Sequence, residues 1–265
     1  MRLTAHQRTE YKNNILFEVI FQARFPQIIR ISNEQPANFQ DQIRKKGFPE
    51  TKIKRVADLP VDIPETIRRA MVGDDEYMFF SENGEWQITL TKDFIALTCT
   101  DYKDYTQFEE RLKTMLEVFH KEYDPTYFSR IGLRYKSLAN EKILGIDKDI
   151  REFVPPHIAP ELEPKASIRD EVQVIEKTLQ LKDESSIVNV RYVYGELSGK
   201  FGKYNLNDEK SYIIDIDCYT KEKVRKVEDA ITKSRTFNEG NIRNIFEWSI
   251  TGALRDAMEP VSGEN

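Results

Sequence analysis

The sequence predicts an α+β fold in which antiparallel sheets carry long amphipathic helices packed on one face. Two observations favour this class. The predicted strands come in runs and each run is followed by a helix, whereas a doubly wound fold would alternate the two. Residues 106–123 and 242–258 repeat apolar side chains at helical spacing, so each stretch can cover a sheet. We expect two lobes, and whether they are structural repeats stays open.

The first half of the chain predicts five strands and a short helix. Pro26 interrupts the first strand, because proline lacks the amide hydrogen that a sheet needs. Asn83-Gly84 suits a type I′ turn and predicts a hairpin. A short helix is expected at residues 36–44. The expected strands are residues 15–31, 77–80, 86–90, 94–100 and 130–138.

The predicted helix at residues 106–123 is the clearest single element. Thr106 and Glu109 have the spacing of a capping box, in which each side chain bonds a backbone amide of the first turn. The apolar stripe that follows consists of Phe108, Leu112, Met115, Leu116 and Phe119. One side of this helix should therefore be buried.

A proline-rich stretch divides the chain into three parts. Residues 139–170 carry four prolines with little periodicity and predict a connection between an N-terminal lobe, residues 1–138, and a C-terminal lobe, residues 171–265. The second lobe predicts strands at residues 172–181, 187–194 and 212–219, with a glycine-bearing turn region at 195–202. Two helices, 224–233 and 242–258, should close the chain.

Composition indicates a folded protein of the cytoplasm. The net charge of −5 gives no overall attraction to nucleic acid or to an anionic membrane. Cys99 and Cys218 lie in apolar runs and predict buried thiols in a reducing compartment. The polar N-terminus lacks the apolar core of a signal peptide, and no window is apolar enough for a membrane span.

Several segments, in order along nearly the whole chain, resemble a sporadically distributed prokaryotic family whose members have no established activity. The segments are FEVIFQARFP (17–26), PANFQ (36–40), FP (48–49), RIGLRY (130–135), DID (215–217) and IFEWSIT (245–251). The resemblance implies no cofactor and no catalytic residue. The scattered occurrence of the family suggests an accessory role in a mobile or defence-related locus.

The parts of a nucleophilic or zinc enzyme are missing from the pattern. No G-x-S-x-G motif occurs, and apolar surroundings would raise the pKa of either thiol. The three histidines are His6, His120 and His157, far apart in the sequence. Two distant cysteines cannot form a zinc site, and the chain has no phosphate-binding glycine loop.

Charged residues on predicted strands form one candidate binding site. Asp215 and Asp217 alternate along a strand, so both carboxylates project from one face and could hold Mg²⁺. The simpler interpretation is a solvated sheet face. A third alternative pairs these carboxylates with Arg130 or Arg134, if the lobes share a sheet or pack together. Arg24 and these arginines could also line an anion-binding surface.

A basic stretch is the candidate contact for nucleic acid. It contains Arg44, Lys45, Lys46, Lys52, Lys54 and Arg55. Such a loop could contact phosphates, although charge runs usually form solvated surface.

We therefore expect a non-catalytic protein-interaction or regulatory protein, with a protein partner or a second copy of itself as the ligand. No cofactor is expected. The alternatives are a Mg²⁺-dependent enzyme acting on a phosphorylated or nucleotide substrate, and a nucleic-acid-binding protein.

Overall fold

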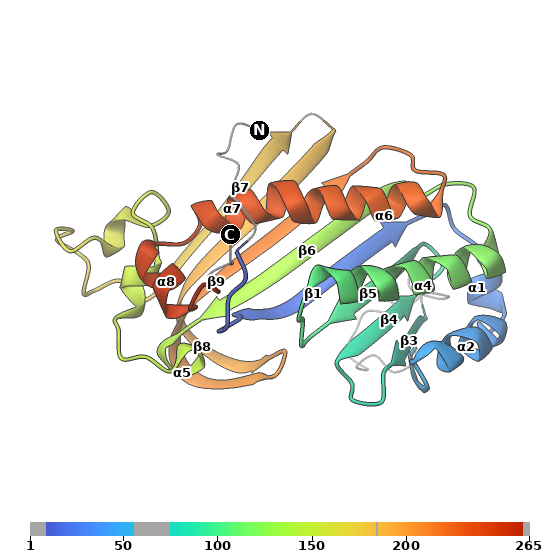
Figure 1. Cartoon of the computed structure of the whole chain (residues 1–265), viewed down its shortest axis with the longest axis horizontal. Coiled ribbons are helices and arrows are strands. Elements are labelled where there is room, and N and C mark those ends of the chain that lie inside the picture. Colours follow the sequence, from blue (N-terminus) through green and yellow to red (C-terminus); the bar gives the residue numbers. More distant parts are fainter. Residues whose placement is uncertain (1–8, 56–74, 184, 262–265) are drawn as a thin grey trace, which may run out of the picture.

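In a computed structural model, which describes residues 9–55, 75–183 and 185–261, the strands form one antiparallel sheet of nine (Figure 1). Its strand order is β2-β3-β4-β5-β1-β6-β9-β8-β7. The strands are β1 (Leu16–Arg24), β2 (Glu50–Lys54), β3 (Glu76–Phe80), β4 (Trp86–Leu90), β5 (Phe94–Cys99), β6 (Arg130–Ala139), β7 (Ile175–Asp183), β8 (Ser186–Phe201) and β9 (Tyr204–Thr220).

The predicted fold class is wrong. We expected antiparallel sheets with long amphipathic helices packed on one face, in two lobes, and whether the lobes share one sheet was open. In the structure β6 pairs with β9, with Arg134 opposite Asp217, so strands from both halves of the chain belong to one sheet. Most described helices are also short. Sequence periodicity shows which face of a strand is buried, but it does not show which strands are neighbours.

Helix α4 (Tyr105–Tyr123) is the longest of the described segments that are α-helical throughout. Its apolar stripe is buried as predicted, and Phe108 packs against Trp86 of β4 with ring centroids 5.8 Å apart. The predicted cap is wrong, because the Asp104 carboxylate accepts the Gln107 amide hydrogen bond at 2.9 Å. The helix therefore begins one residue before Thr106. An aspartate is as good a cap as a threonine and gains more from the helix dipole.

The other described helical segments are short. They are α1 (Ile29–Asn33), α2 (Ala37–Ile43), η1 (Arg44–Lys46), α5 (Glu141–Leu144), η3 (Ile150–Phe153), η4 (Pro160–Leu162), α6 (Val227–Thr236), the π-helical η5 (Phe237–Ile242), α7 (Arg243–Trp248) and α8 (Gly252–Ala257). Of these, α6, η5 and α7 follow one another without a break and form one continuous helical run (Figure 1). The helix expected at residues 242–258 is nevertheless broken, between α7 and α8. The hydroxyl of Thr251 caps α8, and the Tyr212 hydroxyl donates to the carbonyl of Ser249 at the break.

Two further local predictions need correction. The chain after Pro26 forms the helix α1 rather than more strand. The β3–β4 hairpin is present, but among the described residues only Gly84 of its turn has a positive φ, whereas a type I′ turn needs two. The Gly84 amide donates to the Ser81 carbonyl, so the loop is a type I turn closed by a left-handed glycine.

Strands β8 and β9 form a hairpin much longer than predicted. The expected turn region at residues 195–202 is mostly strand, and the chain reverses only between Phe201 and Tyr204. This end of the hairpin packs on the start of β1, where Phe17 contacts Phe201 edge to face with centroids 5.7 Å apart. Extra pairing satisfies more backbone groups than a loop would.

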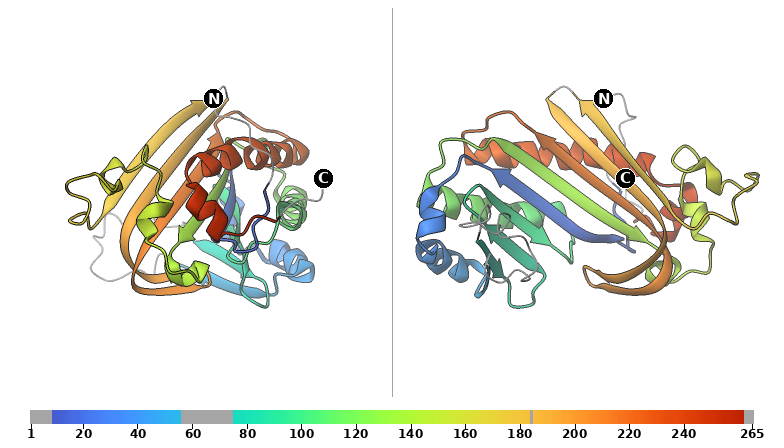
Figure 2. Two further views of the ribbon diagram at one scale, coloured as in Figure 1. Left: turned by 60° about the vertical axis from the view of Figure 1, so that its left-hand side comes forward. Right: turned by 180° about the vertical axis from the view of Figure 1, so that it is seen from behind.

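The sheet has one apolar and one polar face. Odd-numbered residues of β1, such as Val19 and Phe21, are fully buried in the core. Figure 1 shows α4, α6 and α7 in front of the sheet, and the view from behind in Figure 2 shows β1, β6 and β9 with no helix in front of them. No described helix is both long and apolar enough to cross a bilayer.

Candidate functional site

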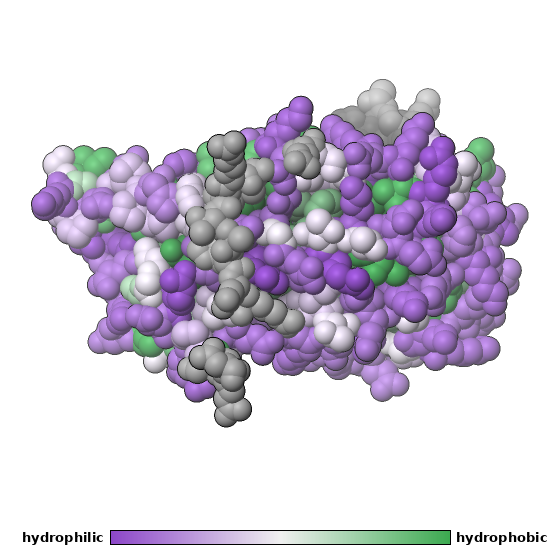
Figure 3. All heavy atoms as spheres, turned by 45° about the horizontal axis from the view of Figure 1, so that its top comes forward, coloured by the Kyte–Doolittle hydropathy of each residue, from purple (hydrophilic) through white to green (hydrophobic). Residues whose placement is uncertain are grey.

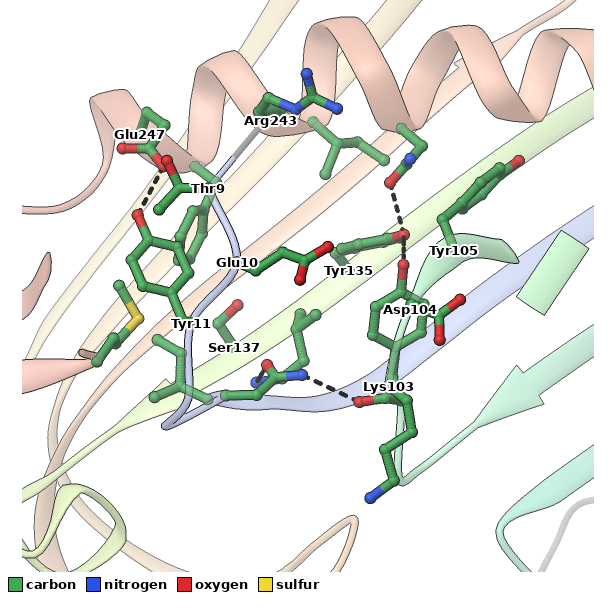
Figure 4. A pocket seen from close by; sticks show the side chains of 18 of the residues that line it. Thr9, Glu10, Tyr11, Lys103, Asp104, Tyr105, Tyr135, Ser137, Arg243 and Glu247 are labelled. Atoms are coloured by element: carbon green, nitrogen blue, oxygen red, sulfur yellow. Dashed lines mark hydrogen bonds between the residues drawn. The ribbon is translucent and has the colours of Figure 1, made fainter. Parts of the chain in front are cut away.

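A cavity of about 620 Å³ lies between the sheet, the start of α4 and the η5–α7 segment (Figure 4). Its lining is Thr9, Glu10, Tyr11, Asn14, Ile15, Leu16, Tyr102, Lys103, Asp104, Tyr105, Thr106, Tyr135, Ser137, Ile216, Asn238, Ile242, Arg243, Phe246, Glu247, Met258 and Val261. Apolar side chains and hydrogen-bonding groups alternate around it. The size and the mixed lining are those of a small-ligand site.

A hydrogen-bond chain crosses one wall of the cavity. Tyr135 projects from β6 and donates its hydroxyl hydrogen to Asn238 Oδ1 at 2.8 Å. The hydroxyl oxygens of Tyr135 and Tyr102 are 3.0 Å apart. Because the Tyr135 hydrogen is directed at Asn238, the Tyr102 hydroxyl can donate its own hydrogen to the Tyr135 oxygen. The Tyr102 backbone carbonyl accepts a bond from Asn14 Nδ2 at 3.0 Å. Four distant parts of the chain are therefore held in one arrangement before any ligand binds.

A buried glutamate stabilises the opposite wall. Glu247 is 8% exposed and accepts from the Tyr11 hydroxyl at 2.9 Å and from Arg255 Nη2 at 2.6 Å. Both ends of the described chain form the adjoining rim, because Val261 donates its amide to the Glu10 carbonyl at 2.8 Å. A buried carboxylate needs such partners, since burial alone would make its charged form costly.

The π-helical segment η5 gives the third wall. A π-helix adds a residue to the turn and is often found at functional sites. Asn238 and Ile242 lie four residues apart on η5 and both line the cavity. Asn241 points elsewhere, donating to Ser186 Oγ at 3.0 Å. The two asparagines of this segment therefore point to different places, Asn238 to the cavity and Asn241 to the sheet.

Two tyrosines of the cavity, Tyr11 and Tyr105, are neutral at ordinary pH. Burial, together with the hydrogen bond to Glu247, raises the pKa of Tyr11 to about 12. Burial also raises the pKa of Tyr105, whose hydroxyl donates to Ser234 Oγ at 2.9 Å. These side chains are thus hydrogen-bonding groups and aromatic surfaces rather than bases or nucleophiles.

Sequence reasoning missed this site, although one signal was present. Tyr135 and Ser137 are polar groups on the face of β6 that is otherwise apolar. A polar side chain among core positions indicates a partner or a cavity. Figure 4 shows Glu10 extending across the cavity toward Tyr135, while Lys103 points away from it.

The predicted binding residues lie on the polar face of the sheet instead. Arg134 makes two hydrogen bonds to Asp215, at 2.7 and 2.5 Å, and Arg130 Nη2 lies 3.0 Å from Asp217 Oδ2. This is the ion-pairing arrangement considered as the third alternative. Arg24 is exposed at the end of β1, where its backbone neighbour on β6 is Arg130.

Gly132 makes room for the Arg130 guanidinium. A Cβ atom at this glycine would lie 2.6 Å from Arg130 Nη1, and the guanidinium carbon lies 4.3 Å from the Tyr219 ring centroid. Arg130 also donates to Gln22 Oε1 at 3.1 Å. The N–H groups of the Arg130 guanidinium are therefore directed along the sheet, toward Gln22 and Asp217.

Two residues of the basic stretch form ion pairs with acidic side chains of this chain. Arg44 pairs with Asp41 at 2.9 Å, and Lys54 pairs with Glu76 at 3.5 Å. The Lys52 ammonium lies 5.2 Å from the Phe80 ring centroid. Lys45, Lys46 and Arg55 are exposed as well.

Within the described ranges, no three or more His, Cys, Asp or Glu side chains gather as a metal-binding group. Asp215 and Asp217 each already have an arginine partner.

Comparison with protein-family models gave no match, and comparison with curated proteins gave none either. The chain is therefore defined here by its fold and its site: a single antiparallel sheet with a tyrosine-lined cavity on its helix side.

The two cysteines should resist thiol reagents in the native state. Burial raises the pKa of Cys99 to about 11 and that of Cys218 to about 12, so neither forms thiolate near neutral pH. With Ellman's reagent at pH 8 we expect no rapid reaction from folded protein and two thiols per chain after denaturation. Rapid release of one equivalent from the native protein would contradict this prediction and would reopen a role for a cysteine nucleophile.

Proposed function

We propose that this protein is a non-catalytic accessory or regulatory protein that acts by binding, and that the cavity holds the group it recognises. The observation that supports this most strongly is the hydrogen-bond chain of Tyr102, Tyr135 and Asn238 along one wall of a cavity of about 620 Å³. Groups held in place before binding lose little freedom when the ligand arrives, which favours affinity.

The lining indicates the chemistry of the ligand. Aromatic rings such as Phe246 and Tyr105 offer faces and edges for another ring, and Asn238 and Ser137 offer hydrogen-bonding atoms. The best fit is an uncharged aromatic group that carries a hydroxyl, amide or ring N–H. Such a group can belong to a small molecule or to a side chain of a partner protein.

The same lining supports binding rather than catalysis. No cysteine or histidine is among the described residues that form the cavity. The carboxylate of Asp104 caps α4, and that of Glu247 is held by Tyr11 and Arg255. These two carboxylates are engaged in structural bonds, which supports a role in holding the site rather than in acid–base catalysis. The third carboxylate of the lining, Glu10, extends across the cavity and could contact a ligand (Figure 4).

The proposal includes a cytoplasmic location and a protein partner. Two free, buried thiols suit a reducing compartment. The alternatives are less well supported. A magnesium enzyme would need carboxylate oxygens that are now bonded to arginines, and the basic stretch is interrupted by its own ion pairs.

Filling the cavity should abolish binding. Ser137 is 2% exposed and projects into the cavity from β6, so Ser137→Phe places a ring where the ligand would lie. The probes are indole, p-cresol and N-acetyltyrosinamide at millimolar concentration. We expect at least one of them to raise the Tm of the natural protein by at least about 2 °C, roughly 1 kcal/mol for a chain of this size. Ser137→Phe should show no shift.

Two further variants make this test specific. Thr232→Phe adds the same ring at an exposed position of α6 and should respond to the probes as the natural protein does. Asn238→Ala removes the acceptor of the hydrogen-bond chain without filling the cavity and should weaken the response. The proposal fails if no probe shifts Tm, or if Ser137→Phe responds as strongly as the natural protein.

A further inference from the structure

Among the residues that the structure describes, no strand pairs with the outer edge of β7, which ends the sheet. Strand β7 pairs with β8 along its whole length of nine residues, with no shift in register, and is the last strand in the sheet order. It contains no proline. Figures 1 and 2 show the β7–β8 hairpin extending past the helices. Backbone N–H and C=O groups on such an edge are free to pair with another strand, and proteins that avoid this use short, bulged or proline-bearing edges.

Apolar side chains lie along this edge. Leu179 and Leu181 are only partly buried against the core, and Val174, which comes just before the strand, is 62% exposed. Elsewhere, the side of the molecule drawn in Figure 3 is mostly hydrophilic, with hydrophobic side chains in small separate patches. An added strand would cover the exposed parts of both leucines, which favours edge pairing over docking on a broad apolar face.

The charges of the strand are complementary to those of a second copy. In an antiparallel pair of identical strands centred on Leu179, position 176 lies opposite position 182 of the second copy. The side chains of opposed residues point to the same face of the joined sheet. Glu176 then faces Lys182 of the second copy, and the two-fold axis repeats the contact. Thr178 faces Gln180 of the second copy. Glu176 already bonds Arg191 at 2.9 Å, so its carboxylate would lie between two cations.

We propose that two copies of this chain pair through β7, antiparallel and centred on Leu179, joining their sheets into one continuous sheet. The inference is independent of the cavity, since no residue of β7 lines it. Lys177 does not oppose the pairing, because its ammonium is already bonded to the carbonyls of His157 and Ile158 at 3.2 and 3.1 Å.

A charge-complementation experiment tests both the partner and the register. Lys182→Glu and Glu176→Lys change exposed side chains, so both variants should fold. Alone, each variant would place like charges opposite one another twice, and we expect its dimer to dissociate at least tenfold more readily than that of the natural protein. Mixed, the two variants have complementary charges at both contacts and should form a mixed dimer. Sedimentation velocity across the micromolar range measures each species.

Lys200→Glu is the matched control, because it makes the same charge change at an exposed position near the far end of β8 and should leave the dimer intact. Circular dichroism verifies the fold of every variant. A natural protein that stays monomeric at 100 µM overturns the inference. So does a mixture of the two charge variants that associates no better than either alone.

Discussion

Phe108→Ala should destabilise the protein by about 4 kcal/mol, the range found when a buried phenylalanine is truncated. Phe108 is fully buried, and its ring contacts Trp86, Tyr102 and Tyr105, with centroids 5.8, 6.2 and 6.2 Å away. Removing the ring leaves a space that two tyrosines of the cavity wall would move to fill. Urea denaturation measures the loss, and the thermal-shift probes measure the accompanying loss of binding.

Gln107→Ala is the control for this change. Gln107 is the exposed neighbour of Phe108 in the first turn of α4, and its backbone amide, which bonds Asp104, is kept. Its effect should be within about 0.5 kcal/mol, as for most surface substitutions. A similar free energy of unfolding for both variants would show that α4 does not pack on β4 as described.

Gly202→Ala should cost about 3 kcal/mol or more. Gly202 has a φ of +55°, and a Cβ atom there would lie 2.3 Å from the Phe17 carbonyl oxygen. The left-handed conformation alone costs an alanine about 1 kcal/mol. The close contact raises the cost further, because the Phe17 carbonyl is a backbone group and cannot rotate away as a flexible side chain would. The β8–β9 turn must therefore move away from β1. Denaturation by urea or heat should show the loss.

Gly84→Ala separates the two causes. Gly84 has a φ of +71° in another hairpin turn, but an added Cβ atom would meet nothing within 4 Å. It therefore carries the conformational cost without the close approach and should lose only about 1 kcal/mol. Equal losses at both glycines would mean that the end of the long hairpin does not lie against Phe17.

The two functional proposals can be judged separately. Filling the cavity at Ser137 leaves the β7 edge unchanged, and reversing the charge of Lys182 leaves the cavity unchanged. A dimer without a ligand would support pairing through β7 and would overturn the proposal that the cavity holds the recognised group. A ligand without a dimer would support binding in the cavity and would overturn pairing through β7.

The sequence by itself determined the local elements and their buried faces. The stripe of α4, the β3–β4 hairpin and the alternation of β6 follow from side chains a few residues apart, because helical and strand periodicities are local properties. Burial of both cysteines also followed from their apolar neighbours. The same alternation placed Asp215 and Asp217 on one face of β9, although it could not identify their partners.

Only the tertiary structure decided that β6 joins β9, that the last predicted helix breaks near Ser249, and that Tyr102, Tyr135 and Asn238 meet. Each of these depends on contacts between residues far apart in the chain. Backbone hydrogen bonds are alike at every strand edge, so the strand order is chosen by how all the side chains pack together. The cavity results from that choice, because its three walls come from separate segments that share no sequence pattern.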